Sequence, residues 1–260
     1  MGLAAGLAAC GARDRIADAA RQPNAATPER AYSAPPTVTT ASRLAGGRIQ
    51  LEGRARPGAQ VRLATPAGAA ILARADGRGA WRLRLPPDVG LRLFGLSMSE
   101  GARIVQAEGY LAVTPRGAAA QLRAGAGAVV LSPGGAAPHI LAVDFDRQGG
   151  AVVSGDGAPG TPVILKADGS PRGQLRVDAG GRFSLALNEP LTPGDHRLEA
   201  VGPGPGAASA AVTVPVSAAA PLTQGPFRAA RAPFGWRIDW MTPGGGVQTS
   251  LLIAPPEAAS

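Results

Sequence analysis

The sequence is poor in the residues on which most catalytic sites depend. It has one cysteine, so no disulfide can form within the chain, and it has two histidines, His139 and His196. Both histidines are expected on strand surfaces. The motifs G-x-S-x-G and HExxH and a phosphate-binding loop do not occur. We therefore predict a non-enzymatic protein with no catalytic residues and no cofactor.

Lysine and aromatic residues are also scarce. The net charge is +8, but Lys166 is the only lysine, and the arginines are scattered through the predicted strands without a cluster of five or more. Aromatic residues make up 4% of the chain and do not alternate with the arginines, as a stacking platform for nucleic acid would require. Nucleic acid is therefore not an expected partner. A general attraction to anionic surfaces, such as lipid headgroups or acidic glycans, agrees better with this charge.

Glycine and proline are abundant, with 37 and 25 residues, while 45% of the chain is hydrophobic. The valine, leucine and isoleucine residues occur in short runs between Gly/Pro-rich segments. This pattern is typical of short strands joined by turns, so we predict an all-β fold.

The only cysteine ends the apolar stretch "MGLAAGLAAC". The residues Leu7-Ala8-Ala9-Cys10 resemble the lipobox of bacterial lipoproteins, which implies lipidation of Cys10, a membrane partner and a periplasmic or outer-membrane location. The alternative is a buried or incidental thiol near a disordered end. Residues 11–35 are polar and rich in alanine and proline, and we expect them to form a flexible linker. No other segment has enough apolar residues to cross a bilayer.

The chain contains an internal repeat. Residues 36–86 align without a gap with residues 138–188, 102 positions later. The matched segments include "GRARPGAQVRL" and "GDGAPGTPVIL", and Trp81 in the first copy corresponds to Phe183 in the second. Because each copy is too long for a solenoid unit, we expect each to be a domain with its own core.

Each copy has alternating strands and Asp-x-x-Gly turns. "AWRLRLP" places Trp81, Leu83 and Leu85 on one face, as a half-buried strand does. The segments beginning at Asp76, Asp146 and Asp178 fit type I turns. Asp144 and Asp146 also form an acidic pair, but two carboxylates are too few for a calcium site, so we predict no metal.

The Pro-Gly corner, followed by strands and a D-x-x-G-x-W/F segment, resembles bacterial Ig-like domains. The resemblance implies two tandem β-sandwiches, at 36–115 and 138–216, with an additional hairpin or connector at 116–137. In that family such domains act as spacers, adhesins and binding modules, so the resemblance implies a fold more than an activity.

The segment 217–260 contains a linker and a predicted β-hairpin, in which "GWRIDW" and "VQTSLLI" flank "TPGGG". Trp236 and Trp240 share one strand face by the period of two. With Phe234, they are either an exposed aromatic surface for a sugar or protein partner, or an apolar face docked on the second domain.

Together these patterns predict a cell-envelope lipoprotein that serves as a structural or interaction module. The first alternative is a carbohydrate-binding accessory protein that recognises peptidoglycan or exopolysaccharide through Trp236 and Trp240. The second is an unrecognised hydrolase on a β scaffold.

Overall fold

The computed structural model describes residues 33–131, 135–204, 206 and 209–254. Cys10 and nearly all of the predicted linker 11–35 lie outside the described residues. From Ala34 onward the described chain belongs to one compact unit. Within the described residues the single helical element is a short 3-10 turn, Ala45–Gly47, so the prediction of an all-β fold is confirmed.

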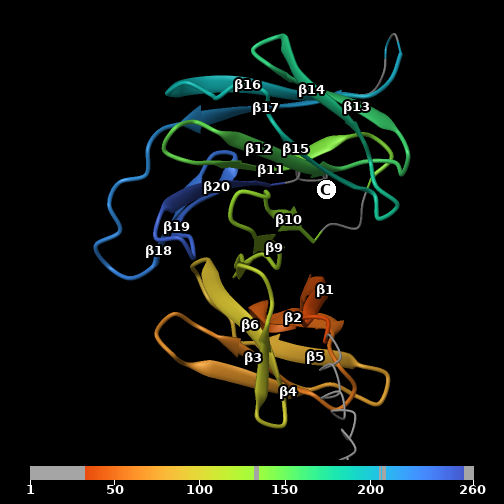
Figure 1. Cartoon of the computed structure of the whole chain (residues 1–260), viewed down its shortest axis with the longest axis vertical. Coiled ribbons are helices and arrows are strands. Elements are labelled where there is room, and N and C mark those ends of the chain that lie inside the picture. The colour runs from red at the N-terminus through yellow and green to blue at the C-terminus, as the bar shows by residue number, and fades with distance from the viewer. Residues whose placement is uncertain (1–32, 132–134, 205, 207–208, 255–260) are drawn as a thin grey trace, which may run out of the picture. The chain divides into compact units, whose positions relative to one another are not determined.

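The first copy of the repeat forms two antiparallel sheets (Figure 1). Its strands are β1 (Thr37–Arg43), β2 (Ile49–Arg54), β3 (Gln60–Ala64), β4 (Ala70–Arg74), β5 (Ala80–Leu85), β6 (Arg92–Glu100) and β7 (Arg103–Gln106). One sheet has the order β1-β2-β5. The other contains β4-β3-β6, and β7 pairs with the end of β6.

The second copy follows the same plan. Its strands are β11 (His139–Phe145), β12 (Ala151–Asp156), β13 (Pro162–Ala167), β14 (Ser170–Arg176), β15 (Arg182–Ala186), β16 (Gly194–Val201) and β17 (Ser209–Val216). The adjacent strands β11-β12-β15 correspond to β1-β2-β5, and the facing sheet has the order β14-β13-β16-β17. Five strands of the second copy begin 102 residues after their counterparts, so the sequence repeat is confirmed as a structural repeat.

Each sandwich has a core built from the alternating apolar residues of its facing sheets. Trp81 on β5 is 3% exposed and Phe183 on β15 is 4% exposed, so the matched aromatics fill equivalent places in the two cores. The same equivalence explains a shared glycine. A Cβ atom at Gly53 would lie 2.5 Å from the Trp81 ring, and one at Gly155 would lie 2.4 Å from the Phe183 ring. The same Cβ atoms would lie 1.9 Å from the carbonyl oxygens of Thr37 and His139 on the neighbouring strands, so only glycine fits between the backbone and the ring.

The predicted Asp-x-x-Gly turns are present. The Oδ1 atom of Asp76 accepts hydrogen bonds from the backbone N–H groups of Ala80 and Arg78, and these bonds lower the pKa of Asp76. Asp146 and Asp178 accept equivalent backbone hydrogen bonds. The glycine that ends the first turn, Gly79, has φ = 78°, a conformation that favours glycine. The turn geometry thus accounts for the carboxylate of Asp146 without a bound ion.

Both sandwiches are extended by strands that lie outside the repeat. These are β8 (Tyr110–Val113), β9 (Ala119–Leu122), β10 (Val129–Val130), β18 (Phe227–Ala232), β19 (Gly235–Met241) and β20 (Val247–Ile253). The first three continue the sheet of β6 in the order β10-β9-β8-β6. The last three continue the sheet of β11 in the order β11-β20-β19-β18. The expected C-terminal hairpin is therefore part of a larger sheet: β19 pairs with β20 as predicted, but β20 also pairs with β11.

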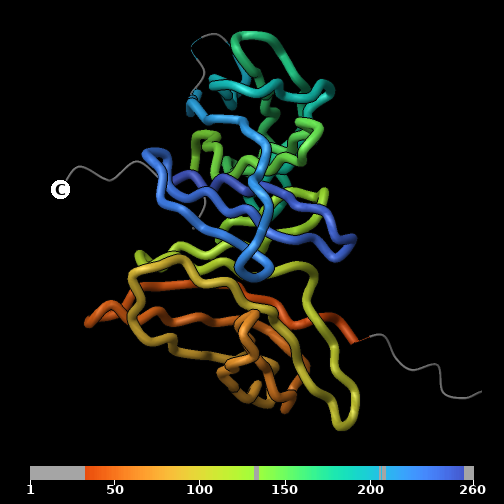
Figure 2. The backbone as a smooth tube through the Cα atoms, turned by 90° about the vertical axis from the view of Figure 1, so that its left-hand side faces the viewer, coloured from red at the N-terminus to blue at the C-terminus, as the bar shows by residue number. Residues whose placement is uncertain are grey.

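The backbones of the two extensions lie against each other (Figure 2). Their buried side chains form a third core. The buried residues of this third core are Leu91, Leu93, Ala112, Ala120, Leu122, Ala128, Ala142, Ile238, Trp240 and Leu252. They alternate with residues of the sandwich cores: Phe94 faces the first core and Leu93 faces the third. Strands in this region are therefore buried on both faces.

Candidate binding sites

The aromatic face of β19 is buried. Trp236, Ile238 and Trp240 do share one face, as the period of two predicts, but Trp240 is 0% exposed and Ile238 is 0% exposed. The ring of Tyr110 on β8 meets the ring of Trp240 edge-on, with 5.8 Å between centroids. Of the two interpretations of the sequence, this burial excludes the exposed surface and agrees with a docked apolar face. The face docks on β6, β8 and β9, whereas the sequence-based alternative had it docked on the second domain.

The three predicted surface aromatics are not brought together. Trp236 is partly buried at the edge of the third core, and the guanidinium of Arg231 lies 5.8 Å from its ring centroid. Phe234 packs instead against the core of the second sandwich. Because Trp240 is enclosed, Trp236 and Trp240 cannot together stack on two rings of a sugar chain in this structure.

The third core contains a buried carboxylate. Asp144 on β11 is 2% exposed, and it accepts hydrogen bonds from the backbone N–H of Ala128 (2.7 Å), from Nε2 of Gln248 (3.2 Å) and from the Ser250 hydroxyl. The indole Nε1 of Trp240 in turn donates to Ser250 Oγ at 3.0 Å. Burial raises the pKa of Asp144 despite these donors. Ionisation of Asp144 therefore opposes folding as the pH rises through its folded-state pKa.

The loop between β9 and β10 is held by side chains of β11 and β20, which belong to the second sandwich. Gln248 on β20 accepts a hydrogen bond from the backbone N–H of Gly125 (3.0 Å) and donates one to the carbonyl of Arg123 (3.3 Å). With the bond from Ala128 to Asp144, three backbone groups of this loop have partners on β11 and β20. The loop is thereby fixed in register against the second sandwich.

The histidines lie in hydrogen-bonded pairs that the sequence did not reveal. His196 is 9% exposed, which corrects the expectation of a surface strand residue. Its Nδ1 lies 2.7 Å from Asp168 Oδ2, and its Nε2 lies 2.7 Å from the carbonyl oxygen of Thr192. Both partners are acceptors, so only the doubly protonated ring makes both bonds. His139 is partly exposed, with Nδ1 3.2 Å from Asp156.

The charge state of His196 follows from these contacts. Burial disfavours the imidazolium, but the hydrogen bonds to Asp168 and to Thr192 together outweigh it and raise the pKa of His196 above its ordinary value. The backbone N–H of Arg197 and the His196 ring hold the pKa of Asp168 below its ordinary value. A ring with both nitrogens engaged and a raised pKa is poorly suited to act as a general base.

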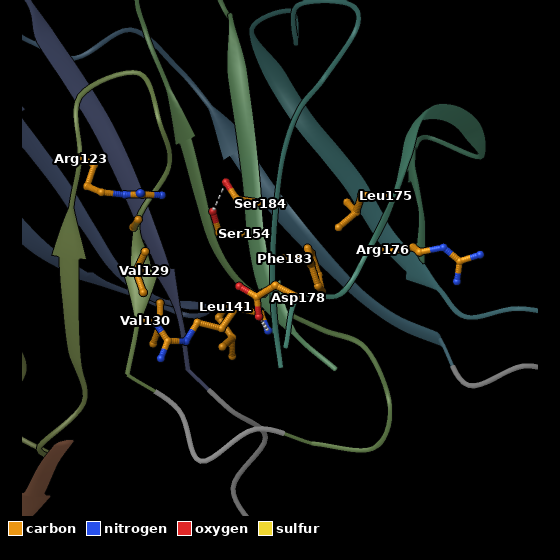
Figure 3. Close-up of a pocket in the computed structure, with 13 residues that line it drawn as sticks. Arg123, Val129, Val130, Leu141, Ser154, Leu175, Arg176, Asp178, Phe183 and Ser184 are labelled. Atoms are coloured by element: carbon orange, nitrogen blue, oxygen red, sulfur yellow. Dashed lines mark hydrogen bonds between the residues drawn. The ribbon is translucent and has the colours of Figure 1, made fainter. Parts of the chain in front are cut away.

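A pocket of about 460 Å³ lies where the β9–β10 loop meets β12 and β15 (Figure 3). The polar residues that line it are Arg123, Ser154, Arg176, Asp178, Arg182 and Ser184. Its apolar lining includes Val129, Val130, Leu141, Leu175 and Phe183. In Figure 3 the side chain of Arg123 extends toward the two serines, and that of Arg176 turns away from them. We refer to this site as the arginine pocket.

No single motif marks the arginine pocket in the sequence, because its lining comes from separate segments. Arg123 follows β9, Ser154 belongs to β12, and Arg182 opens β15. The only sequence signal is a difference between the repeats. Ser154 and Ser184 stand where the first copy has Glu52 and Arg82, the partners of an ion pair with 2.8 Å between Oε1 and Nε.

Within the described ranges, 33–131, 135–204, 206 and 209–254, no group of three or more His, Cys, Asp or Glu side chains is arranged to hold a metal ion. In the same part of the chain, no helix has the length and apolar character needed to span a membrane.

No protein-family model matches the chain, and no curated protein matches it. Several solved structures are similar at low identity, among them two adhesin structures and one receptor structure. A tetra-tandem repeat from the extending region of a large adhesion protein is 15% identical over 88% of this chain and 68% of that chain, with a TM-score of 0.23. The chicken interferon gamma receptor alpha chain is 13% identical over 71% and 100%, with a TM-score of 0.22. A Ca2+-stabilized adhesin that helps an Antarctic bacterium bind ice is 13% identical over 85% and 66%, with a TM-score of 0.22. At these identities and TM-scores the likenesses carry no information on function.

Substitution of Trp240 tests whether this residue is part of the core or part of an exposed binding surface. We expect Trp240→Ala to lower the free energy of unfolding by roughly 3–5 kcal/mol, because it removes a fully buried aromatic side chain. The neighbouring Met241 is 41% exposed, so Met241→Ala is a matched control that should change stability by about 0.5 kcal/mol or less. Urea unfolding measures both. A loss below about 1 kcal/mol for Trp240→Ala would contradict the buried placement.

The His196 pair predicts a pH-dependent contribution to stability. Because the folded-state pKa is raised, the contribution is full below the ordinary value of 6.5 and is lost as the pH rises through the folded-state pKa. The stability difference between the wild type and His196→Gln should thus be larger at about pH 5.5 than at about pH 8.5. Asp168→Asn should remove most of this pH dependence. A stability difference between the wild type and His196→Gln that is constant or increases with pH would contradict the raised pKa of His196.

Proposed function

We propose that the chain is a non-enzymatic structural and interaction module of a bacterial cell envelope, carried on a lipid anchor at Cys10. One observation supports the structural part most directly: the third core joins the extensions of both sandwiches. Domains linked in tandem usually move relative to each other unless their interface is large and hydrophobic. Here the interface has an apolar core and a satisfied polar network around Asp144.

Such a unit suits a role as a rigid spacer. The polar, Ala/Pro-rich segment 11–35 would give reach and freedom next to the membrane, and the paired sandwiches would hold any ligand site at a fixed distance beyond it. The resemblance of both repeats to bacterial Ig-like domains agrees with this division of roles. Envelope proteins or glycans are the partners that the proposal implies.

The two alternative functions have less support. Carbohydrate binding through Trp236 and Trp240 would require the third core to open, because Trp240 is fully buried. A hydrolase that uses His196 as a base would have to break its bonds to Asp168 and Thr192. Neither rearrangement has a cause in the described part of the chain.

The anchor is tested by substitution of the lipobox-like cysteine. In a bacterial host that processes lipoproteins, we expect the wild-type protein to fractionate with membranes and Cys10→Ser to abolish that association. Ala5→Ser introduces the same side chain outside the Leu7-Ala8-Ala9-Cys10 motif and should leave the fractionation unchanged. Mass spectrometry of the mature N-terminus gives an independent readout. An unmodified Cys10 in the membrane-bound protein would refute the anchor.

A further inference from the structure

The arginine pocket has the size and the mixed lining of a small-molecule site. A volume of about 460 Å³ lies within the usual range for such sites, roughly 300–1,000 Å³. It combines cationic, hydroxyl, carboxylate and apolar groups in one concave surface. Its walls come from the first sandwich's extension and from the second sandwich, so it exists only where the two meet.

The charge of Arg123 favours the ionised form of the buried Asp144 without a close contact between the two groups. In the described part of the chain, neither Arg123 nor Arg182 forms an ion pair within 4 Å. Arg123 is oriented by the carbonyl oxygens of Gly127 and Ala126, each at 3.0 Å from its Nε and Nη2 atoms, and its Nη1 is not used in these bonds. A pre-oriented guanidinium with unused donors is suited to bind a carboxylate or a phosphate.

Arg182 is not required by the fold. The first copy of the repeat has Ala80 at the equivalent position, and its strand β5 occupies the place of β15. The carboxylate Oδ1 of Asp178, which also lines the pocket, accepts the backbone N–H of Arg182 at 2.9 Å as part of its turn. The Arg182 side chain is therefore a feature of the second copy alone.

The remaining polar groups fit a ligand that carries hydroxyl groups. Ser154 Oγ and Ser184 Oγ lie 3.2 Å apart, and Ser184 donates onward to the carbonyl of Ala126 at 3.2 Å. The serine oxygens keep lone pairs that can accept hydrogen bonds, and Asp178 offers a further acceptor. The apolar side chains, such as Leu141, provide contact for the C–H face of a ring.

We propose that the arginine pocket binds a monosaccharide-sized hydroxylated anion, that is, an acidic sugar bearing a carboxylate or a phosphate. Arg123 and Arg182 bind the anionic group, and Ser154, Ser184 and Asp178 accept hydrogen bonds from hydroxyl groups. The presence of both charges favours a ligand with hydroxyl groups. A simple inorganic anion would bind the arginines but would be repelled by Asp178, whereas a sugar hydroxyl can donate a hydrogen bond to Asp178. The site is separate from the buried aromatic face of β19.

The experiment is isothermal titration calorimetry of the full chain with glucuronate, glucose 1-phosphate and glucose. We expect at least one of the two anions to bind and neutral glucose not to bind, and the tighter of the two identifies the anionic group. Arg182→Ala, which copies the first repeat, and Arg123→Gln should each weaken binding about tenfold or more. Arg62→Ala removes the same charge from the exposed face of β3 and should leave the affinity unchanged.

Several results would overturn the proposal. These are no binding of either anion up to about 10 mM, equal binding of glucose, or equal losses in Arg62→Ala and Arg182→Ala. Circular dichroism and the Tm of each variant show whether the fold is retained. If Arg123→Gln loses its fold because its loop is released, Arg182→Ala alone decides, since Ala80 shows that the repeat accepts alanine there.

Discussion

Asp144 lies in the interface between the two sandwiches, and all three of its hydrogen-bond donors in the described chain are uncharged groups. A carboxylate removed from water is tolerated only when its oxygens are satisfied, so β11, β20 and the loop before β10 must meet at one place. Trp240 joins this network through Ser250, which links the largest apolar side chain of the third core to its polar centre. The apolar residues supply most of the favourable burial, and Asp144 specifies the register in which the two faces come together.

The repeat itself follows from local rules that can be read along the chain. The Asp-x-x-Gly turns, the alternation in "AWRLRLP" and the matched aromatics Trp81 and Phe183 each depend on neighbours close in sequence or on the period of a strand. These features predicted the all-β class and the equivalence of β1–β6 with β11–β16. Gly53 and Gly155 were matched by alignment. Why glycine is needed there could not be predicted, because a neighbouring carbonyl oxygen and an aromatic ring come close to each Cα only in the folded sheet.

The third core could not be predicted from alternation, because its strands are buried on both faces. "YLAV" and "ILAV" are continuous apolar runs of the kind expected for such strands, yet an apolar run alone does not indicate which strand or face packs against it. Trp240 was therefore open to two interpretations, and only the pairing of β20 with β11 and the docking of β8 decided between them. The arginine pocket was equally hidden, since Arg123, Ser154 and Arg182 meet only after both sandwiches and the β9–β10 loop are in place.

We infer that the third core makes the two sandwiches one cooperative unit. Differential scanning calorimetry of the full chain tests it most directly, because a single two-state transition has equal calorimetric and van't Hoff enthalpies. We predict one such transition in the wild type, and a separation into two transitions when Asp144→Ala and Trp240→Ala are combined. Two resolved transitions in the wild type, with only one of them shifted by these substitutions, would show that the sandwiches unfold independently.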